Sequence, residues 1–186
     1  MSATAAPSQR LLNRVAIVAG SCQGLERGIC LQFHLEGALL ICADLRPNGL
    51  PGEEPTHEVI QKQGRRAIFK VDVSDSKQVQ AMIAQAVEEY GALHMLVKNN
   101  AGICGEATAA KPIDEADEDI FDLHMMISVK GPFMGPKYAL RQMKKQEPIG
   151  RGDRGWIINL SSIVTSAGMR GLHKCHHPSY EIREAH

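Results

Sequence analysis

The chain has 186 residues, and its 21 lysines and arginines balance its 21 aspartates and glutamates, so its formal net charge is +0. A neutral chain of this length fits one α/β domain and supplies no basic field for a nucleic acid or an anionic membrane surface. Aromatic residues make up only 4% of the chain, which disfavours base-stacking platforms, and no apolar run approaches the ~20 residues that a membrane span needs.

The five cysteines are scattered along the chain and odd in number. This pattern favours free thiols over a disulfide framework, so we expect a protein of the reducing cytoplasm. Residues 1–13 are small and polar and lack the apolar stretch of a signal peptide. They are predicted to form a flexible N-terminal lead.

The chain is organised around an apolar run that ends in a glycine-rich turn and is followed by a helical pattern. Val15–Ala19 is predicted to be a buried strand, Gly20 to Gly24 a tight turn, and the helix to continue to about Leu35. Glycines without side chains let backbone N–H groups and the helix N-terminus approach a pyrophosphate. The turn therefore favours a dinucleotide site, with a purely structural βαβ turn as the alternative.

A second apolar run, residues 39–43, supports the dinucleotide interpretation. It is predicted to be a strand, and it ends in Asp44, twenty residues after Gly24. An acidic residue at that distance is placed to bind the adenosine ribose hydroxyls.

The rest of the chain alternates between helical and strand patterns. Three further strands are predicted at 67–71, 93–97 and 156–160. Before the first of them we expect a helix capped by Thr56 and ending at Gly64, and before the second a helix that opens at Ser74 or Ser76 and ends at Tyr90. A long helical stretch from about Asp117 to Gln146 precedes the third, and its Gly131, Pro132 and Pro136 should kink or divide it. Such alternation predicts an α/β fold with a doubly wound parallel sheet.

Several short motifs occur in an order and spacing that together are specific. They are Gly20-x-x-x-Gly24, Asp44, Asp72-Val73, Asn99-Asn100-Ala101-Gly102, Lys130-Gly131-Pro132-Phe133 and Ile157-Ile158-Asn159-Leu160-Ser161-Ser162. Over roughly residues 12–172 the chain resembles the short-chain dehydrogenase/reductase family. The resemblance implies an NAD(P)-binding Rossmann domain over 14–172, followed by an irregular polar tail at 173–186.

Members of that family move a hydride between a nicotinamide cofactor and a secondary alcohol or ketone. The resemblance implies that the cofactor-binding residues are Gly20, Ser21, Gln23, Gly24, Leu25, Asp44, Asp72, Val73, Asn100, Ala101 and Gly102. Asp44 would favour NAD over NADP, because its carboxylate repels a 2′-phosphate. A small-molecule alcohol or ketone is the expected partner, with no nucleic acid, membrane or metal.

The resemblance also implies where the proton-transfer groups should lie. Ser162 matches the serine that hydrogen-bonds the substrate oxygen, and Ser128 stands where the family has the asparagine of its proton relay. The family's acid/base tyrosine should fall at Cys175 and its lysine at Ser179. Tyr180 is the nearby tyrosine and the candidate to replace them in a catalytic role, with Lys174 or Arg183 as its cationic partner.

Two further departures affect the predicted cofactor site. Glu26 replaces the third glycine of the turn, where its carboxylate would face and repel a pyrophosphate; alternatively it rotates out to solvent. Lys98 is an extra residue between the apolar strand and the two asparagines. It reverses the direction of the following side chains unless a bulge absorbs it.

The pattern of the family ends near Leu172, so we expect a C-terminally incomplete sheet with an uncovered edge. A homo-oligomer is possible, but its subunits are expected to associate more weakly, because the second of the two helices through which family members often associate is missing. Two alternatives to an active oxidoreductase stay open: a catalytically inactive nucleotide-binding or interaction module, and a truncated non-functional product.

The tail holds a cluster of possible metal ligands: His173, Cys175, His176 and His177. The cluster is predicted to be solvated rather than a zinc site.

Overall fold

A computed structural model describes residues 8–46, 48–62, 69–99, 117–150 and 152–160. Within them five parallel strands form one sheet in the order β3-β2-β1-β4-β5. The strands are β1 (Val15–Ala19), β2 (Leu39–Asp44), β3 (Phe69–Lys70), β4 (Met95–Asn99) and β5 (Trp156–Leu160). The helices are α1 (Gly24–Leu35), α2 (Thr56–Gln61), α3 (Ser76–Tyr90), α4 (Glu118–Met125) and α5 (Gly131–Met143), with a π-helical segment η2 (Met126–Lys130) between the last two.

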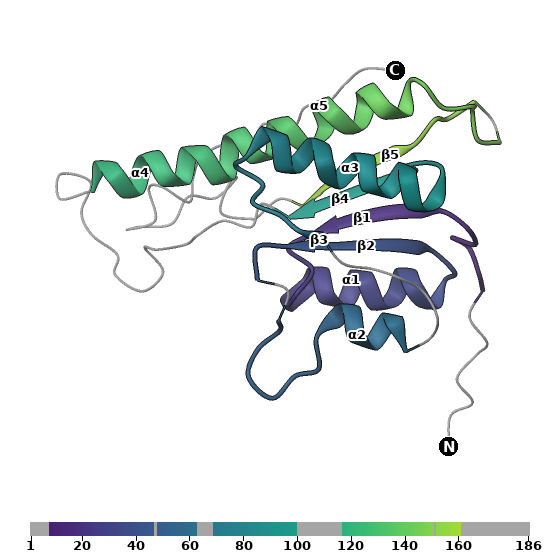
Figure 1. Ribbon diagram of the computed structural model, residues 1–186, viewed down its shortest axis with the longest axis horizontal. Helices are drawn as coiled ribbons and strands as arrows, with labels where there is room; N and C mark the ends of the chain where they lie inside the picture. The colour runs from purple at the N-terminus through teal and green to yellow at the C-terminus, as the bar shows by residue number, and fades with distance from the viewer. Residues whose placement is uncertain (1–7, 47, 63–68, 100–116, 151, 161–186) are drawn as a thin grey trace.

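Helices cover both faces of the sheet, as a doubly wound fold requires. In Figure 1, α1 and α2 lie on one side of the strands and α3 and α5 on the other. Every residue of β1 is buried, and alternate residues serve opposite faces. Val15 and Ile17 join the apolar cluster under α3 and α5, whereas Ala16 and Val18 join the cluster under α1 and α2. The predicted fold class is confirmed.

The fourth strand begins two residues later than predicted. Leu93 is buried, but its N–H donates to Oε1 of Gln146 at 2.7 Å, and its carbonyl accepts from Nε2 of the same side chain at 2.9 Å. Because one glutamine amide satisfies both backbone groups, Leu93 needs no partner strand, and pairing with β1 begins at Met95. At its other end β4 continues to pair with β5 through Lys98 and Asn99.

Of two predicted helix starts, one is corrected and one is confirmed. Thr56 is not the cap of α2 but its first residue, following Pro55, and its hydroxyl serves another contact described below. Helix α3 begins at Ser76, one of the two predicted starts, and its cap is Asp75, whose carboxylate accepts a hydrogen bond from the N–H of Lys77 at 2.8 Å.

The long helical stretch is divided, as its glycine and prolines predict. The division takes the form of the π segment η2, which ends where Gly131 opens α5. Pro132 lies in the first turn of α5, where a missing N–H costs nothing, and Pro136 lies inside the helix. Figure 1 shows α4 extending beyond the carboxyl ends of the strands.

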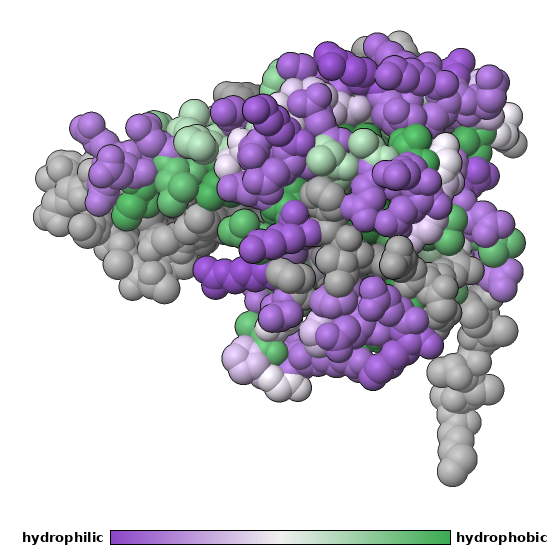
Figure 2. Space-filling model, in the orientation of Figure 1, coloured by the Kyte–Doolittle hydropathy of each residue, from purple (hydrophilic) through white to green (hydrophobic). Residues whose placement is uncertain are grey.

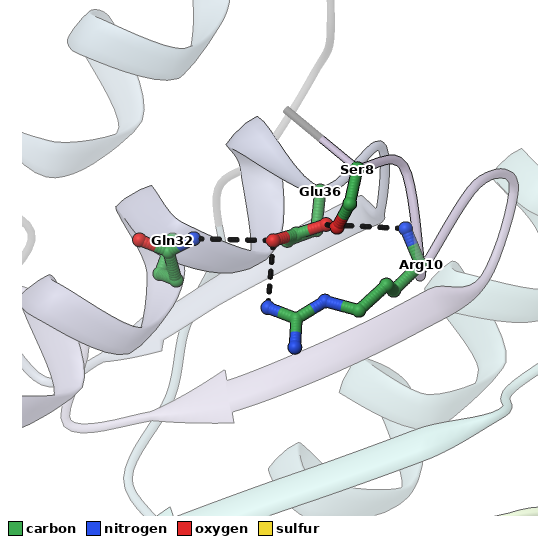
Figure 3. Close-up of polar contacts among 4 residues, drawn as sticks. All are labelled: Ser8, Arg10, Gln32 and Glu36. Atoms are coloured by element: carbon green, nitrogen blue, oxygen red, sulfur yellow. Dashed lines mark hydrogen bonds and ion pairs between the residues drawn. The ribbon is translucent and has the colours of Figure 1, made fainter. Parts of the chain in front are cut away.

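The described part of the predicted N-terminal lead is bound to the end of α1. Figure 3 shows the Glu36 carboxylate accepting hydrogen bonds from the Ser8 hydroxyl, from the Arg10 guanidinium and backbone N–H, and from the Gln32 amide. The Arg10 guanidinium, together with the Ser8 hydroxyl, lowers the pKa of Glu36 to about 2. Residues 8–13 thus connect directly to the helix that leads away from the glycine-rich turn.

None of the helices in the described ranges is both long and apolar enough to cross a lipid bilayer.

Candidate functional site

The glycine-rich turn lies between the end of β1 and the start of α1. Gly20 has φ +81° and donates its N–H to the carbonyl of Ala43 at 2.8 Å, which fixes the turn against β2. Gly24 has φ +63°, a conformation that side-chain-bearing residues rarely adopt. The cap position, Gln23, makes no side-chain hydrogen bond, so the first N–H groups of α1 stay available to a ligand.

Asp44 lies at the end of β2, directly beside this turn. Its Oδ2 accepts a hydrogen bond from the N–H of Cys22 at 3.0 Å, and its Oδ1 accepts one from the N–H of Arg46 at 3.0 Å. Each carboxylate oxygen keeps a lone pair for a further donor, such as a ribose hydroxyl. Burial and the Asp44 carboxylate raise the pKa of the Cys22 thiol to about 12, so this thiol stays protonated.

Ser21 and Thr56 join the turn to helix α2. The Ser21 side chain is buried, and its hydroxyl is 3.3 Å from the carbonyl of Ala43, whereas Gln23 and Leu25 are exposed. Thr56, 1% exposed, donates its hydroxyl to the carbonyl of Ser21 at 2.7 Å and accepts from the Arg27 guanidinium at 2.9 Å. This contact was not predicted, because no sequence pattern links two residues 35 positions apart.

Glu26 does not turn out to solvent. It is 6% exposed, and its Oε2 is 3.7 Å from where a Cβ on Gly24 would stand. Its Oε1 has no hydrogen-bond partner within the described part of the chain. The side chain is thus folded back toward the glycine-rich turn, and of the two sequence-based alternatives the structure favours the one in which Glu26 faces the turn.

Lys98 occupies the opposite face of the sheet. Pairing is regular on both sides of β4, with Lys98 opposite Ala19 and Asn159, so no bulge absorbs the extra residue between Met95 and Asn99. The lysine stem passes the α5 helix, with Cδ 3.6 Å from where a Cβ on Gly135 would stand. The residue is 7% exposed, its Nζ has no partner among the described residues, and burial lowers its pKa to about 7.

The Lys98 side chain borders a cavity of about 40 Å³ between the sheet and helices α3 and α5. The lining is otherwise apolar or glycine, and it comprises Ala19, Gly20, Val73, Val79, Met82, Leu96, Ile127, Gly131, Pro132 and Gly135. The sequence marked Lys98 as an insertion but gave no sign of this enclosure, which depends on α3 before it and α5 after it in the chain.

The remaining described site candidates lie around the same edge of the sheet. Asp72 follows β3, and its Oδ1 accepts from the N–H of Ser74 at 2.9 Å and from the Ser74 hydroxyl at 2.6 Å. Val73 packs against Gly131 at the start of α5. Ser128 is half-buried in the π segment η2, next to the cavity-lining Ile127.

Five of the predicted site residues lie outside the described residues: Asn100, Ala101, Gly102, Ser162 and Tyr180. The same holds for Cys175, Ser179 and the histidines of the tail.

The arrangement fits the adenosine ribose of a dinucleotide better than it fits the pyrophosphate. Asp44 offers acceptors for the hydroxyls of an adenosine ribose, and the turn offers backbone N–H groups. Glu26, in contrast, adds a buried carboxylate with an unpartnered oxygen beside Gly24. Two like charges about 4 Å apart repel by roughly 4 kcal/mol at an effective dielectric constant of about 20, so an ionised Glu26 opposes a pyrophosphate there.

Comparison with known proteins covers most of the chain. Residues 14–174 match the family model described as short chain dehydrogenase. Levodione reductase of Leifsonia aquatica is 28% identical over 172 residues, and an uncharacterized oxidoreductase of Thermotoga maritima is 34% identical over 159 residues. A crystal structure of a short chain dehydrogenase from Mycobacterium smegmatis superposes with a TM-score of 0.76 at 23% identity, which is evidence for the fold alone.

These proteins are longer than the chain. The matches cover 92% and 86% of the chain but only 60% and 56% of the Leifsonia and Thermotoga proteins, respectively. The structural match covers 90% of the chain and 65% of the Mycobacterium protein. The chain thus spans about three fifths of the length of the curated relatives that it matches.

Proposed function

Because the chain belongs to the short-chain dehydrogenase family, we propose that it binds a nicotinamide dinucleotide and prefers NAD to NADP. The position of Asp44 carries this proposal. Its carboxylate is oriented by two backbone N–H groups beside the glycine-rich turn, where it can accept ribose hydroxyls and would repel a 2′-phosphate. The proposed reaction is hydride transfer between the nicotinamide and a secondary alcohol or ketone.

The preference for NAD is tested by calorimetry of NADH and NADPH binding. We expect NADPH to bind at least tenfold more weakly than NADH, and this ratio to fall toward one in Asp44→Asn. The ratio is the informative quantity, because any loosening of the turn by the substitution weakens both ligands alike. Equal affinities in the unsubstituted protein would contradict the proposed preference.

Glu26 sets how tightly either dinucleotide binds. In Glu26→Gln, which removes the charge at nearly constant size, we expect NADH affinity to rise at least tenfold, because the repulsion of the pyrophosphate disappears. Glu26→Gly removes the whole side chain. Comparing it with Glu26→Gln therefore distinguishes the effect of the charge from the effect of the side chain's volume. Unchanged affinity in both variants would mean that Glu26 does not face the bound pyrophosphate.

The second candidate function is a module that binds the nucleotide without turning over a substrate. It is favoured by Cys175 and Ser179, which stand where the family has its tyrosine and lysine. Positioned acid/base groups contribute about 10²–10⁴-fold to rate, so their loss would leave little hydride transfer. Turnover with NAD and a panel of secondary alcohols, abolished by Ser162→Ala, would support the enzyme; NADH binding without turnover would support the module.

The reducing cytoplasm is the proposed location. Cys30 and Cys42 are buried free thiols with their sulfurs 3.7 Å apart. The hydrogen bond between them, together with burial, raises the pKa of Cys30 well above its usual range, so it carries little thiolate. Free cysteines this close together are typical of a compartment that keeps thiols reduced.

A further inference from the structure

The cavity under α3 and α5 contains a feature that dinucleotide binding does not explain. Lys98 is the single titratable side chain among the described residues that line it, and its amine has no hydrogen-bond partner there. A lysine residue that is only 7% exposed usually has its amine at a carboxylate or at water. Here it ends in an apolar space.

The lining decides which ligand the amine can serve. A protonated amine would need an anion beside it, and a captured anion would need further donors or charges. The other described lining residues are glycine or apolar, and they supply neither. An uncharged ligand that reacts with an uncharged amine fits this environment.

The size of the cavity limits that ligand. A volume of 40 Å³ is about three times what one water molecule requires, so about three or four non-hydrogen atoms fit. The π segment η2 contributes Ile127 to the lining and ends at Lys130, directly before Gly131, another lining residue. Such π-helical insertions in an α-helix frequently occur at functional sites.

We propose that Lys98 is a covalent binding site for small aliphatic aldehydes or ketones, which its amine captures as an imine. The nitrogen lone pair forms a bond to the carbonyl carbon, and the carbonyl oxygen leaves as water with both amine protons. No electron transfer occurs, so no oxidant or reductant is needed, and hydrolysis reverses the step. The proposal does not depend on dinucleotide binding.

The protonation state of Lys98 supports this chemistry. Burial lowers the pKa of its amine to about 7, so about half of it is uncharged at neutral pH. An exposed lysine with a pKa near 10.4 is uncharged in fewer than about one molecule in a thousand. Desolvation in an apolar pocket is a recognised way to activate a lysine as a nucleophile.

The experiment traps the imine. The purified chain is treated at pH 7 with limiting acetaldehyde and sodium cyanoborohydride, which reduces an imine to a stable ethyl-lysine, and is then mapped by peptide mass spectrometry. We expect ethylation of Lys98 at least tenfold faster than that of the exposed Lys77 and Lys144, which serve as internal standards. Lys98→Met should lose the fast modification and leave the slow one unchanged.

Two controls test whether the preference for Lys98 comes from the cavity rather than from the reactivity of the amine alone. The preference for Lys98 should disappear in urea, where the cavity no longer exists, and it should disappear with benzaldehyde, which exceeds the cavity. Modification of Lys98 no faster than Lys144 in the folded chain would overturn the proposal, as would a preference that survives unfolding or is equally strong for benzaldehyde. Because the unsubstituted chain is sufficient for these comparisons, the result does not depend on the stability of Lys98→Met.

Discussion

Glu26 and Lys98 are ionisable side chains buried on opposite faces of the sheet, and each has a terminal atom without a hydrogen-bond partner within the described ranges. Burying a charge without a partner is costly, and such groups concentrate at functional sites. Glu26 lies beside the turn proposed for the pyrophosphate, and Lys98 borders the cavity proposed for a carbonyl compound. Burial without a partner is therefore the observation on which both proposed roles rest.

Lys98 should make stability increase with pH. Its pKa is about 7 in the folded chain and about 10.4 when unfolded, so the unfolded state binds more protons between these values. The free energy of unfolding should therefore rise by about 2 kcal/mol between pH 7 and pH 9 from this residue alone. Lys98→Met should remove that increase, measured as urea-unfolding midpoints at both pH values.

Lys77→Met is the matched control for this measurement, because Lys77 is exposed near the start of α3. It should keep the pH dependence of the unsubstituted chain. If Lys98→Met kept it as well, the amine would be charged in the folded state at neutral pH, and the proposed imine chemistry would lose its support.

At the scale of elements, Gly155 at the junction before β5 has almost no room for a side chain. A Cβ on Gly155 would stand 2.8 Å from the carbonyl oxygen of His94 and 2.7 Å from Sδ of Met143. That same carbonyl accepts the N–H of Trp156 at 2.8 Å and begins the pairing of β5 with β4. The oxygen belongs to the backbone and cannot move aside without disturbing both strands.

Gly155→Ala should therefore destabilise the protein by about 2 kcal/mol or more, because the methyl group displaces β5 from β4. The measurement is the free energy of unfolding in urea. Gly28→Ala is the comparison, because Gly28 lies in α1 with nothing within 4 Å of its added Cβ and does not need a positive φ. A loss no larger than that of the comparison variant would show that β5 can shift without cost.

At the scale of the molecule, β1 connects two apolar clusters, one on each face of the sheet. Neither face can open without exposing residues of the central strand, so we expect the described core to unfold as one unit. Figure 2 shows apolar surface along α4, where Ile120, Phe121 and Leu123 are exposed. This helix lies outside both clusters and contributes little to that unit.

Thermal unfolding tests this view together with cofactor binding. We expect a single transition, and NADH at one hundred times its dissociation constant should add about 2.7 kcal/mol, raising the midpoint by roughly 5–10 °C. NADPH at the same concentration should raise it less. Two separate transitions would contradict one cooperative unit, and an unchanged midpoint with saturating NADH would contradict binding to the folded state.

Much of the fold could be predicted from the sequence, because the signals concerned are local. The buried strand Val15–Ala19, the glycine-rich turn and Asp44 after the next strand predicted the parallel sheet and the family, and both are confirmed. The bounds of β4 were wrong, since the Gln146 side chain, 53 residues away, satisfies the backbone of Leu93. The assignment of the site residues stays a prediction.

The sequence by itself determined the alternation of elements and the residue types at the edge of the sheet, since periodicity and turn chemistry act between near neighbours. Only the tertiary structure decided the environment of each side chain. Glu26 is buried with its carboxylate next to Gly24, and Lys98 is enclosed where α5 meets β4 at Gly135. Burial and charge state depend on segments distant in the chain, and a linear pattern does not encode how closely they pack.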